Sequence, residues 1–178
     1  MEDYRKAERE IAEYLRHHWK KAFELWMGCL VDAGEIVEFA PAMEVREDIW
    51  RDTCNTFLYD TGFKSGKRVA QWLYRTFDLG KKSLKERTIY TDIFFSQSGM
   101  GEIELLKGEE GRILRFRGGS YIAKEMGRVG RKVCYYLAGF IAGATQHFTG
   151  KNYRVEELRC YSNRNPHCEF LAKPLYPL

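Results

Sequence analysis

The sequence predicts an α+β domain, with an antiparallel sheet of about four strands from two hairpins that is covered by helices. Three observations predict it. Apolar residues at helical spacing fill the first part of the chain, hairpin patterns occur twice in the second half, and a long apolar helix pattern separates the two hairpins.

The composition is that of one globular domain with a sizeable core. Of the 178 residues, 44% are hydrophobic and 15% are aromatic, which is enough for a core and an apolar cavity. A net charge of +4 does not by itself predict nucleic-acid binding, so we expect no direct contact with nucleic acid. The sequence contains no run of about 18 apolar residues, so we expect no membrane span. The charged N-terminus lacks the apolar centre of a signal peptide, so we expect a cytoplasmic protein with reduced thiols.

The N-terminal part of the chain is predicted to be a helical arm. Apolar side chains at helical spacing run from Tyr4 to about Leu30, and Gly34 follows as a C-terminal cap. We assign residues 1–40 to this arm and residues 41–178 to the domain that it joins.

Two further helices are expected after a loop that contains Pro41. They run from about Val45 to Tyr59 and from about Ser65 to Phe77, and Gly62 is expected to interrupt them. Residues 81–100 fit either a strand or a short helix.

The second half of the chain alternates hairpins with one long helix. Two short strands, 102–106 and 112–117, flank a glycine-bounded turn. Helical spacing predicts one helix from about Ser120 to Phe148, in which Gly139 and Gly143 share a face and allow another backbone to approach closely. A second hairpin is predicted from strands 153–161 and 168–172.

A candidate metal site lies near the C-terminus. Three of the five cysteines and one carboxylate fall close together in sequence, and thiolates with one carboxylate suit a tetrahedral Zn²⁺ ion: Cys134, Glu157, Cys160 and Cys168. The alternative is that the three cysteines are small buried thiols with no metal. Four protein ligands leave no open position on the ion, so a zinc held here would be structural.

The spacing of the set makes one geometric demand. Glu157 and Cys160 are three residues apart on a predicted strand, which directs them to opposite faces unless a bulge or the end of the strand breaks the alternation. If Glu157 is not a ligand, His167 or a water molecule could complete the shell.

Motifs for other chemistries are weak. Residues 62–68 are only partly similar to a phosphate-binding loop, because the glycine spacing is short by one and no Ser or Thr follows the lysine. Gly62 and Gly66 are better explained by close helix contact. A dinucleotide-binding glycine fingerprint is absent, so we predict no catalytic residues and expect a binding domain more readily than an enzyme.

The C-terminal segment resembles the 4-vinyl reductase domain family. The residues that carry the resemblance are Gly127-Arg-Val-Gly-Arg, Gly139, Gly143, Val155-Glu-Glu-Leu-Arg-Cys160 and Cys168-Glu-Phe170. The family is similar to zinc-containing sensory domains of phenol- and xylene-responsive activators and to small subunits of vesicle-tethering complexes. In its zinc-bearing members a helix cysteine, an E-x-x-C pair and a later cysteine hold the ion, which implies the same role for Cys134, Glu157, Cys160 and Cys168.

The resemblance also implies a homodimer with a pocket for an apolar small molecule beside the zinc site. Six residues are the candidates to line that pocket: Phe94, Ile113, Phe116, Tyr136, Phe140 and Phe148. Phenol-sensing members present tryptophan and histidine to the ligand, and this chain has neither between Leu73 and Gln146, which argues against a phenol. The implied function is a sensory or regulatory small-molecule-binding domain with structural zinc. The alternatives are an interaction scaffold like the tethering subunits, or an enzyme or accessory protein of tetrapyrrole or hydrocarbon metabolism.

Overall fold

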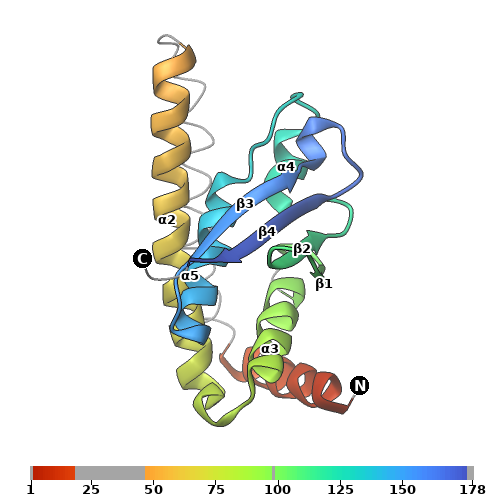
Figure 1. Cartoon of the computed structure of the whole chain (residues 1–178). Coiled ribbons are helices and arrows are strands. Elements are labelled where there is room, and N and C mark those ends of the chain that lie inside the picture. Colours follow the sequence, from red (N-terminus) through yellow and green to blue (C-terminus); the bar gives the residue numbers. More distant parts are fainter. Residues whose placement is uncertain (1, 19–46, 98, 176–178) are drawn as a thin grey trace.

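The computed structural model describes residues 2–18, 47–97 and 99–175, and it confirms the α+β fold (Figure 1). Residues 2–18 are helical. The elements that follow are α2 (Glu47–Thr76), η1 (Leu79–Lys81), α3 (Leu84–Gln97), β1 (Ile103–Lys107), β2 (Arg112–Phe116), α4 (Tyr121–Met126), α5 (Tyr135–Thr149), β3 (Tyr153–Arg159), η2 (Tyr161–Asn163) and β4 (Cys168–Pro174). The predicted loop at 35–44 and the second half of the predicted first helix lie outside the described residues.

The two predicted hairpins form one antiparallel sheet in the order β1-β2-β4-β3. β2 pairs with β4, so the two hairpins join through their later strands, with Leu114 opposite Phe170. Helix α5 packs against the sheet on one side and against α2 on the other (Figure 1). The core between them holds Phe95, Phe116, Phe140 and Phe170, each at most 2% exposed.

Helices α2 and α5 pack backbone against backbone. A Cβ atom built at Gly139 would lie 1.9 Å from the carbonyl oxygen of Tyr59, and one built at Gly62 would lie 1.9 Å from that of Tyr136. Gly66 and Gly143 are in the same situation, at 2.0 Å from carbonyl oxygens of α5 and α2 respectively. The predicted close approach at these glycines is confirmed.

Two expected helix boundaries were wrong. Gly62 does not interrupt a helix: α2 is continuous, because the missing Cβ serves the contact with α5 and the packing offsets the low helix propensity of glycine. The helix expected from Ser120 to Phe148 is instead two helices. Its break contains Gly127 and Gly130, whose φ angles of 69° and 76° leave the helical region.

Residues 81–100, which fitted either a strand or a helix, contain α3. Ser83 precedes α3 and Glu86 lies in its first turn: the Glu86 carboxylate accepts from the Ser83 N–H at 2.8 Å, while Ser83 Oγ accepts from the Glu86 N–H at 3.3 Å. This reciprocal capping box fixes the start of the helix. The helical residues 2–18 pack against the core through Ala7 and Ile11, which are almost fully buried, and Tyr90 of α3 donates a hydrogen bond to Glu10.

Arg87 links α3 to the end of α5. Its guanidinium donates to the carbonyl oxygens of Lys82 at 2.9 Å, Phe148 at 2.9 Å and Gly80 at 3.3 Å, and lies over the ring of Tyr74. Arg87→Lys keeps the charge but loses the planar set of donors, so we expect the free energy of unfolding to fall by about 1–2 kcal/mol. Urea unfolding measures this loss, and an unchanged midpoint would contradict it.

Candidate metal centre and adjoining cavity

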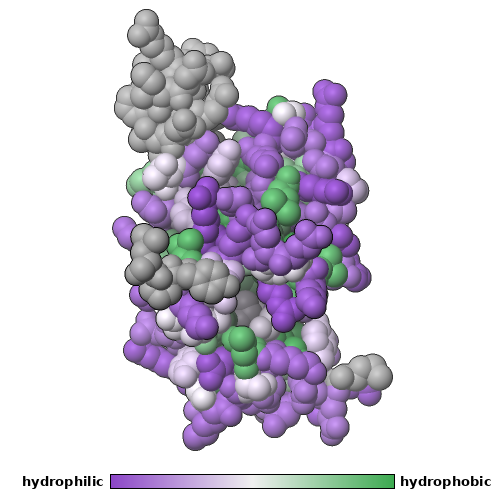
Figure 2. All heavy atoms as spheres, in the orientation of Figure 1, coloured by the Kyte–Doolittle hydropathy of each residue, from purple (hydrophilic) through white to green (hydrophobic). Residues whose placement is uncertain are grey.

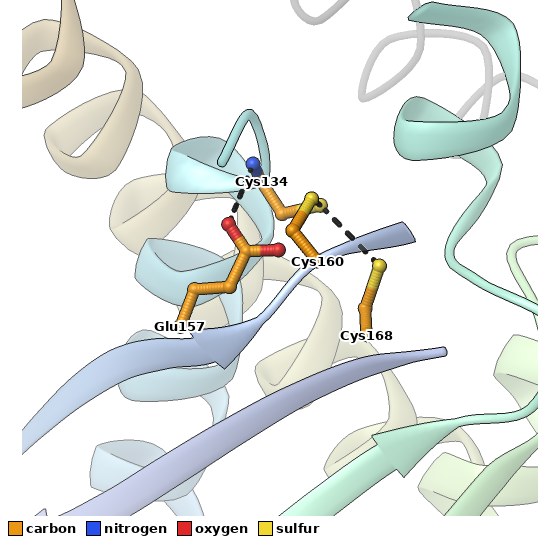
Figure 3. Close-up of side chains that lie close together, drawn as sticks. All are labelled: Cys134, Glu157, Cys160 and Cys168. Atoms are coloured by element: carbon orange, nitrogen blue, oxygen red, sulfur yellow. Dashed lines mark hydrogen bonds between the residues drawn. The ribbon is translucent and has the colours of Figure 1, made fainter. Parts of the chain in front are cut away.

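The four predicted metal ligands come together from three parts of the fold (Figure 3). Cys134 is the N-cap residue of α5, Glu157 lies on β3, Cys160 directly follows β3, and Cys168 begins β4. One ligand atom from each residue can be chosen so that all lie within 4.8 Å of one another. The three cysteines are fully buried, at 0% exposure.

A bulge resolves the strand-parity problem. The pairing of β3 with β4 shifts register between Glu157 and Arg159, so the residues after the shift no longer alternate as in an ideal strand. Cys160 also lies past the last strand residue. A bulge or the end of the strand was the condition for Glu157 and Cys160 to face one ion, and both are present.

The helix break that the sequence did not predict brings Cys134 to this site. Because α5 begins at Tyr135, the Cys134 side chain lies at the helix N-terminus, where backbone N–H groups and the helix dipole favour negative charge. The loop before it is held to the turn after Cys160. Gly130 N–H donates to the Ser162 carbonyl, and Arg128 donates to the carbonyls of Tyr161 and Asn165.

The residues fit a tetrahedral zinc ion by distance and by donor type. The Cys134 sulfur lies 3.9 Å from the sulfur of Cys160 and 3.9 Å from that of Cys168. Two thiolates on one tetrahedral zinc are about 3.8 Å apart, whereas a disulfide joins its sulfurs at about 2.05 Å. Glu157 Oε2 accepts from the Cys134 N–H at 3.1 Å, and Glu157 Oε1 is buried without a hydrogen-bond partner, so one carboxylate oxygen is available to a cation.

The electrostatics of the set favour a cation. Burial raises the pKa of the Glu157 carboxyl to about 8. Hydrogen bonds with Cys134 and Cys160 lower the pKa of the Cys168 thiol to about 3, and its sulfur accepts from the N–H groups of Tyr161 and Ser120. Hydrogen bonds with the other two sulfurs raise the pKa of Cys134. Cys168 is therefore a thiolate near neutral pH, whereas Glu157 and Cys134 hold protons that a dication would displace on binding.

His167, the alternative fourth ligand, lies beside Glu169 and is not part of the clustered set. Its Nε2 is 3.1 Å from Glu169 Oε1, without hydrogen-bond alignment, and Glu169 pairs with Arg115 at 2.8 Å. Among the described residues the candidate set contains Glu157 and not His167.

A cavity of about 690 Å³ lies between the sheet, α3 and the last turns of α5. Phe140 and Phe148 line it, as predicted for a pocket, whereas the other four predicted pocket residues do not. Ile113 falls between Arg112 and Leu114, which do line the cavity, so strand alternation directs its side chain to the other face of the sheet. Phe116 packs against Phe170, Phe94 packs against Trp72, and Tyr136 is buried at the start of α5.

Sequence reasoning missed the wall that α3 contributes. Leu84, Thr88, Asp92 and Phe95 line the cavity and recur at steps of three and four residues. Two of these four residues are polar, so the face that they form carries no apolar periodicity from which a helix could have been predicted.

Comparison with known proteins supports the fold and its C-terminal motifs. Residues 119–174 match the 4-vinyl reductase domain. An uncharacterized protein of Methanocaldococcus jannaschii is 46% identical over 43 residues, a segment that covers 23% of this chain and 19% of that protein. The matched segment thus spans about a fifth of that relative's length.

Three solved structures share the fold at identities below 25%. The phenol-responsive sensory domain of the transcription activator PoxR, solved with phenol, has 21% identity and a TM-score of 0.57, over 68% of this chain and 64% of that one. A vinyl-4-reductase family protein of Methanocaldococcus jannaschii has 16% identity and a TM-score of 0.53, over 82% and 78%. Subunit 3 of a trafficking protein particle complex from Naegleria fowleri, covalently bound to palmitic acid, has 14% identity and a TM-score of 0.62, over 88% and 98%.

None of the helices within the described ranges combines the length and the apolar character that a membrane span requires.

The match to residues 119–174 and the three shared folds together confirm the resemblance of this chain to the 4-vinyl reductase domain family.

Proposed function

We propose that this chain is a small-molecule-binding sensory or regulatory domain in which a structural zinc ion braces the C-terminal hairpin against α5. The observation that carries the proposal is the buried convergence of Cys134, Glu157, Cys160 and Cys168 from three parts of the fold. The fold shared with the sensory domain of PoxR supports the sensory assignment.

The four side chains would hold the zinc, and their role is mechanical. A bound zinc supplies bonds that link the α5 N-terminus to both strands of the hairpin. Four protein ligands leave no position for a substrate or a reactive water, which supports a structural role over a catalytic one. The N–H groups that donate to the Cys168 sulfur orient it and stabilise its negative charge.

The cavity supports small-molecule binding over a scaffold with a filled pocket. Its volume of about 690 Å³ falls in the range of ligand sites, and its walls are mainly apolar, with a few polar side chains. The described residues that line it include no tryptophan and no histidine, so the ligand that we propose differs from the phenol bound by PoxR.

Native mass spectrometry of the purified full chain tests both parts of the proposal. We expect one zinc per chain and a homodimer, with an additional small mass when a ligand copurifies. Protein that carries no metal after purification with added zinc contradicts the metal assignment. A chain that stays monomeric at all concentrations contradicts the dimer.

Glu157→Gln tests the fourth ligand. Gln retains a group that can accept from the Cys134 N–H but loses the anionic oxygen, so we expect zinc affinity to fall at least about tenfold. Competition with a chromophoric chelator measures the change. His167→Gln is the matched control and should leave the affinity unchanged; the reverse pattern would assign the fourth position to His167.

A further inference from the structure

We propose that the cavity takes an amphipathic organic cation, such as a long-chain primary amine, whose ammonium group pairs with Asp92 and whose apolar body lies against the sheet and α5. This inference rests on the proposed function of the cavity as a ligand site and names the class of ligand.

The apolar walls of the cavity come from alternate residues of one sheet face. Ile103 and Leu105 of β1 and Leu114 of β2 line it from the sheet, and Phe140 and Phe148 line it from α5. Apolar groups of a ligand gain most by contact with these walls, which favours a ligand with a large apolar part.

Apolar side chains also reach the rim of the cavity. Tyr4, Leu84 and Leu105 line the cavity and are 40%, 54% and 46% exposed. On the face shown in Figure 2, hydrophobic side chains form small separate patches within a mainly hydrophilic surface. An elongated apolar body that reaches the rim would cover exposed apolar area at Tyr4, Leu84 and Leu105.

Asp92 supplies the charge that selects the ligand. It is the one acidic side chain among the described residues that line the cavity, and none of the ion pairs in the described part of the chain involves it. Burial raises the pKa of its carboxyl to about 6, against the opposing effect of a hydrogen bond from the Ile103 N–H. A half-buried carboxylate that forms no ion pair is stabilised by a ligand that brings a cation into contact with it.

The two cations of the lining do not need an anionic ligand. Lys85 and Arg112 are both exposed, so water solvates their charges at little cost. The requirement for a partner is therefore greater at Asp92. An alkyl carboxylate that paired with Arg112 is the competing possibility, and the experiment separates it from the amine.

Isothermal titration of the zinc-loaded chain with n-decylamine, n-decanol and n-decanoate tests the proposal. Near neutral pH we expect n-decylamine to bind at least about tenfold more tightly than n-decanol, because only the ammonium group pairs with the carboxylate. Asp92→Asn should remove this preference, since the amide is neutral. Arg112→Gln is the matched control, which removes a charge from the same cavity and should not weaken amine binding.

The preference for the amine should also weaken as the pH falls. Asp92 is half protonated at about pH 6 and then loses the charge that pairs with the ligand, while the amine stays charged below about pH 9. The other side chains of the lining that can carry a charge are Tyr4, Lys85, Arg112 and Tyr153. Glu102 and Arg117 are the charged groups that act on Asp92 from outside the lining.

The outcomes separate the ligand class from the ligand site. If n-decanol and n-decylamine bind equally well, the amine class is wrong while the cavity remains a binding site. Tighter binding of n-decanoate that Arg112→Gln abolishes would also overturn the amine class. Failure of all three probes to bind would overturn both the class and the small-molecule part of the proposed function.

Discussion

Gly139→Ala is expected to lower the free energy of unfolding by at least about 3 kcal/mol. The new Cβ would lie 1.9 Å from the Tyr59 carbonyl oxygen and 2.7 Å from its carbon, and both are backbone atoms of a long helix that cannot move alone. Helices α2 and α5 would have to separate, which opens contacts along the core on both sides of the substitution. Denaturant unfolding followed by circular dichroism measures the loss.

Whether Gly139→Ala destabilises or stabilises the protein distinguishes the close backbone contact from the higher helix propensity of alanine. Alanine in place of glycine in an exposed helix stabilises by about 1 kcal/mol, so a stable Gly139→Ala variant would contradict the backbone contact. Gly80→Ala is the matched control. A Cβ there has only side-chain atoms of Tyr74 as its three nearest neighbours, the first at 3.0 Å, and we expect a change within about 1 kcal/mol.

Cys168→Ala is expected to lose the zinc and to lower the melting temperature by about 10 °C, which corresponds to about 4 kcal/mol for a chain of this length. Cys168 touches both Cys134 and the turn that begins at Tyr161, so its loss leaves three ligands and unties β4 from the α5 N-terminus. Metal analysis of the purified variant and thermal unfolding measure the two effects.

Chelation separates the role of the metal from the packing of the thiol. Stripping wild-type protein with a strong chelator should lower its melting temperature by most of the same amount, and the chelator should then have no effect on Cys168→Ala. Cys29→Ala, which changes a cysteine outside the four clustered residues, should keep its zinc. An equal chelator effect on wild type and on Cys168→Ala would place the metal elsewhere.

The sequence was sufficient for the elements with strong local signals and failed where tertiary contact decides. Both hairpins could be predicted because turn residues separate short β-prone runs, glycines in the first and Ser162-Asn-Arg-Asn-Pro166 in the second, and they form as expected. The apolar pattern continued across Gly127 and Gly130, so it predicted one helix where the chain makes two. At Gly62 the error was the opposite one. Glycine has a low helix propensity, yet α2 is continuous there because the missing Cβ lets the backbone of α5 approach.

The residues of the candidate metal centre could be predicted for a chemical reason, and the cavity walls could not. Cysteine and glutamate at a recognisable spacing indicate coordination, and the four residues do converge. Apolar cavity walls use the same residues as the core: Phe140 lines the cavity, whereas Phe116 fills the interior beside it. Only the arrangement of α3 against the sheet distinguishes the two roles.

The positions of the ligands along the chain give the proposed metal one further property. Cys134 and Cys168 are 34 residues apart, so an ion that binds both closes the segment between them into a ring. Such a ring restricts the unfolded chain and favours the native state by an entropic route that adds to the contacts in the folded protein. Because α5 and β3 lie within the ring and β4 begins where the ring closes, the segment from Cys134 to Cys168 should resist local opening and proteolysis as a single unit for as long as the ion stays bound.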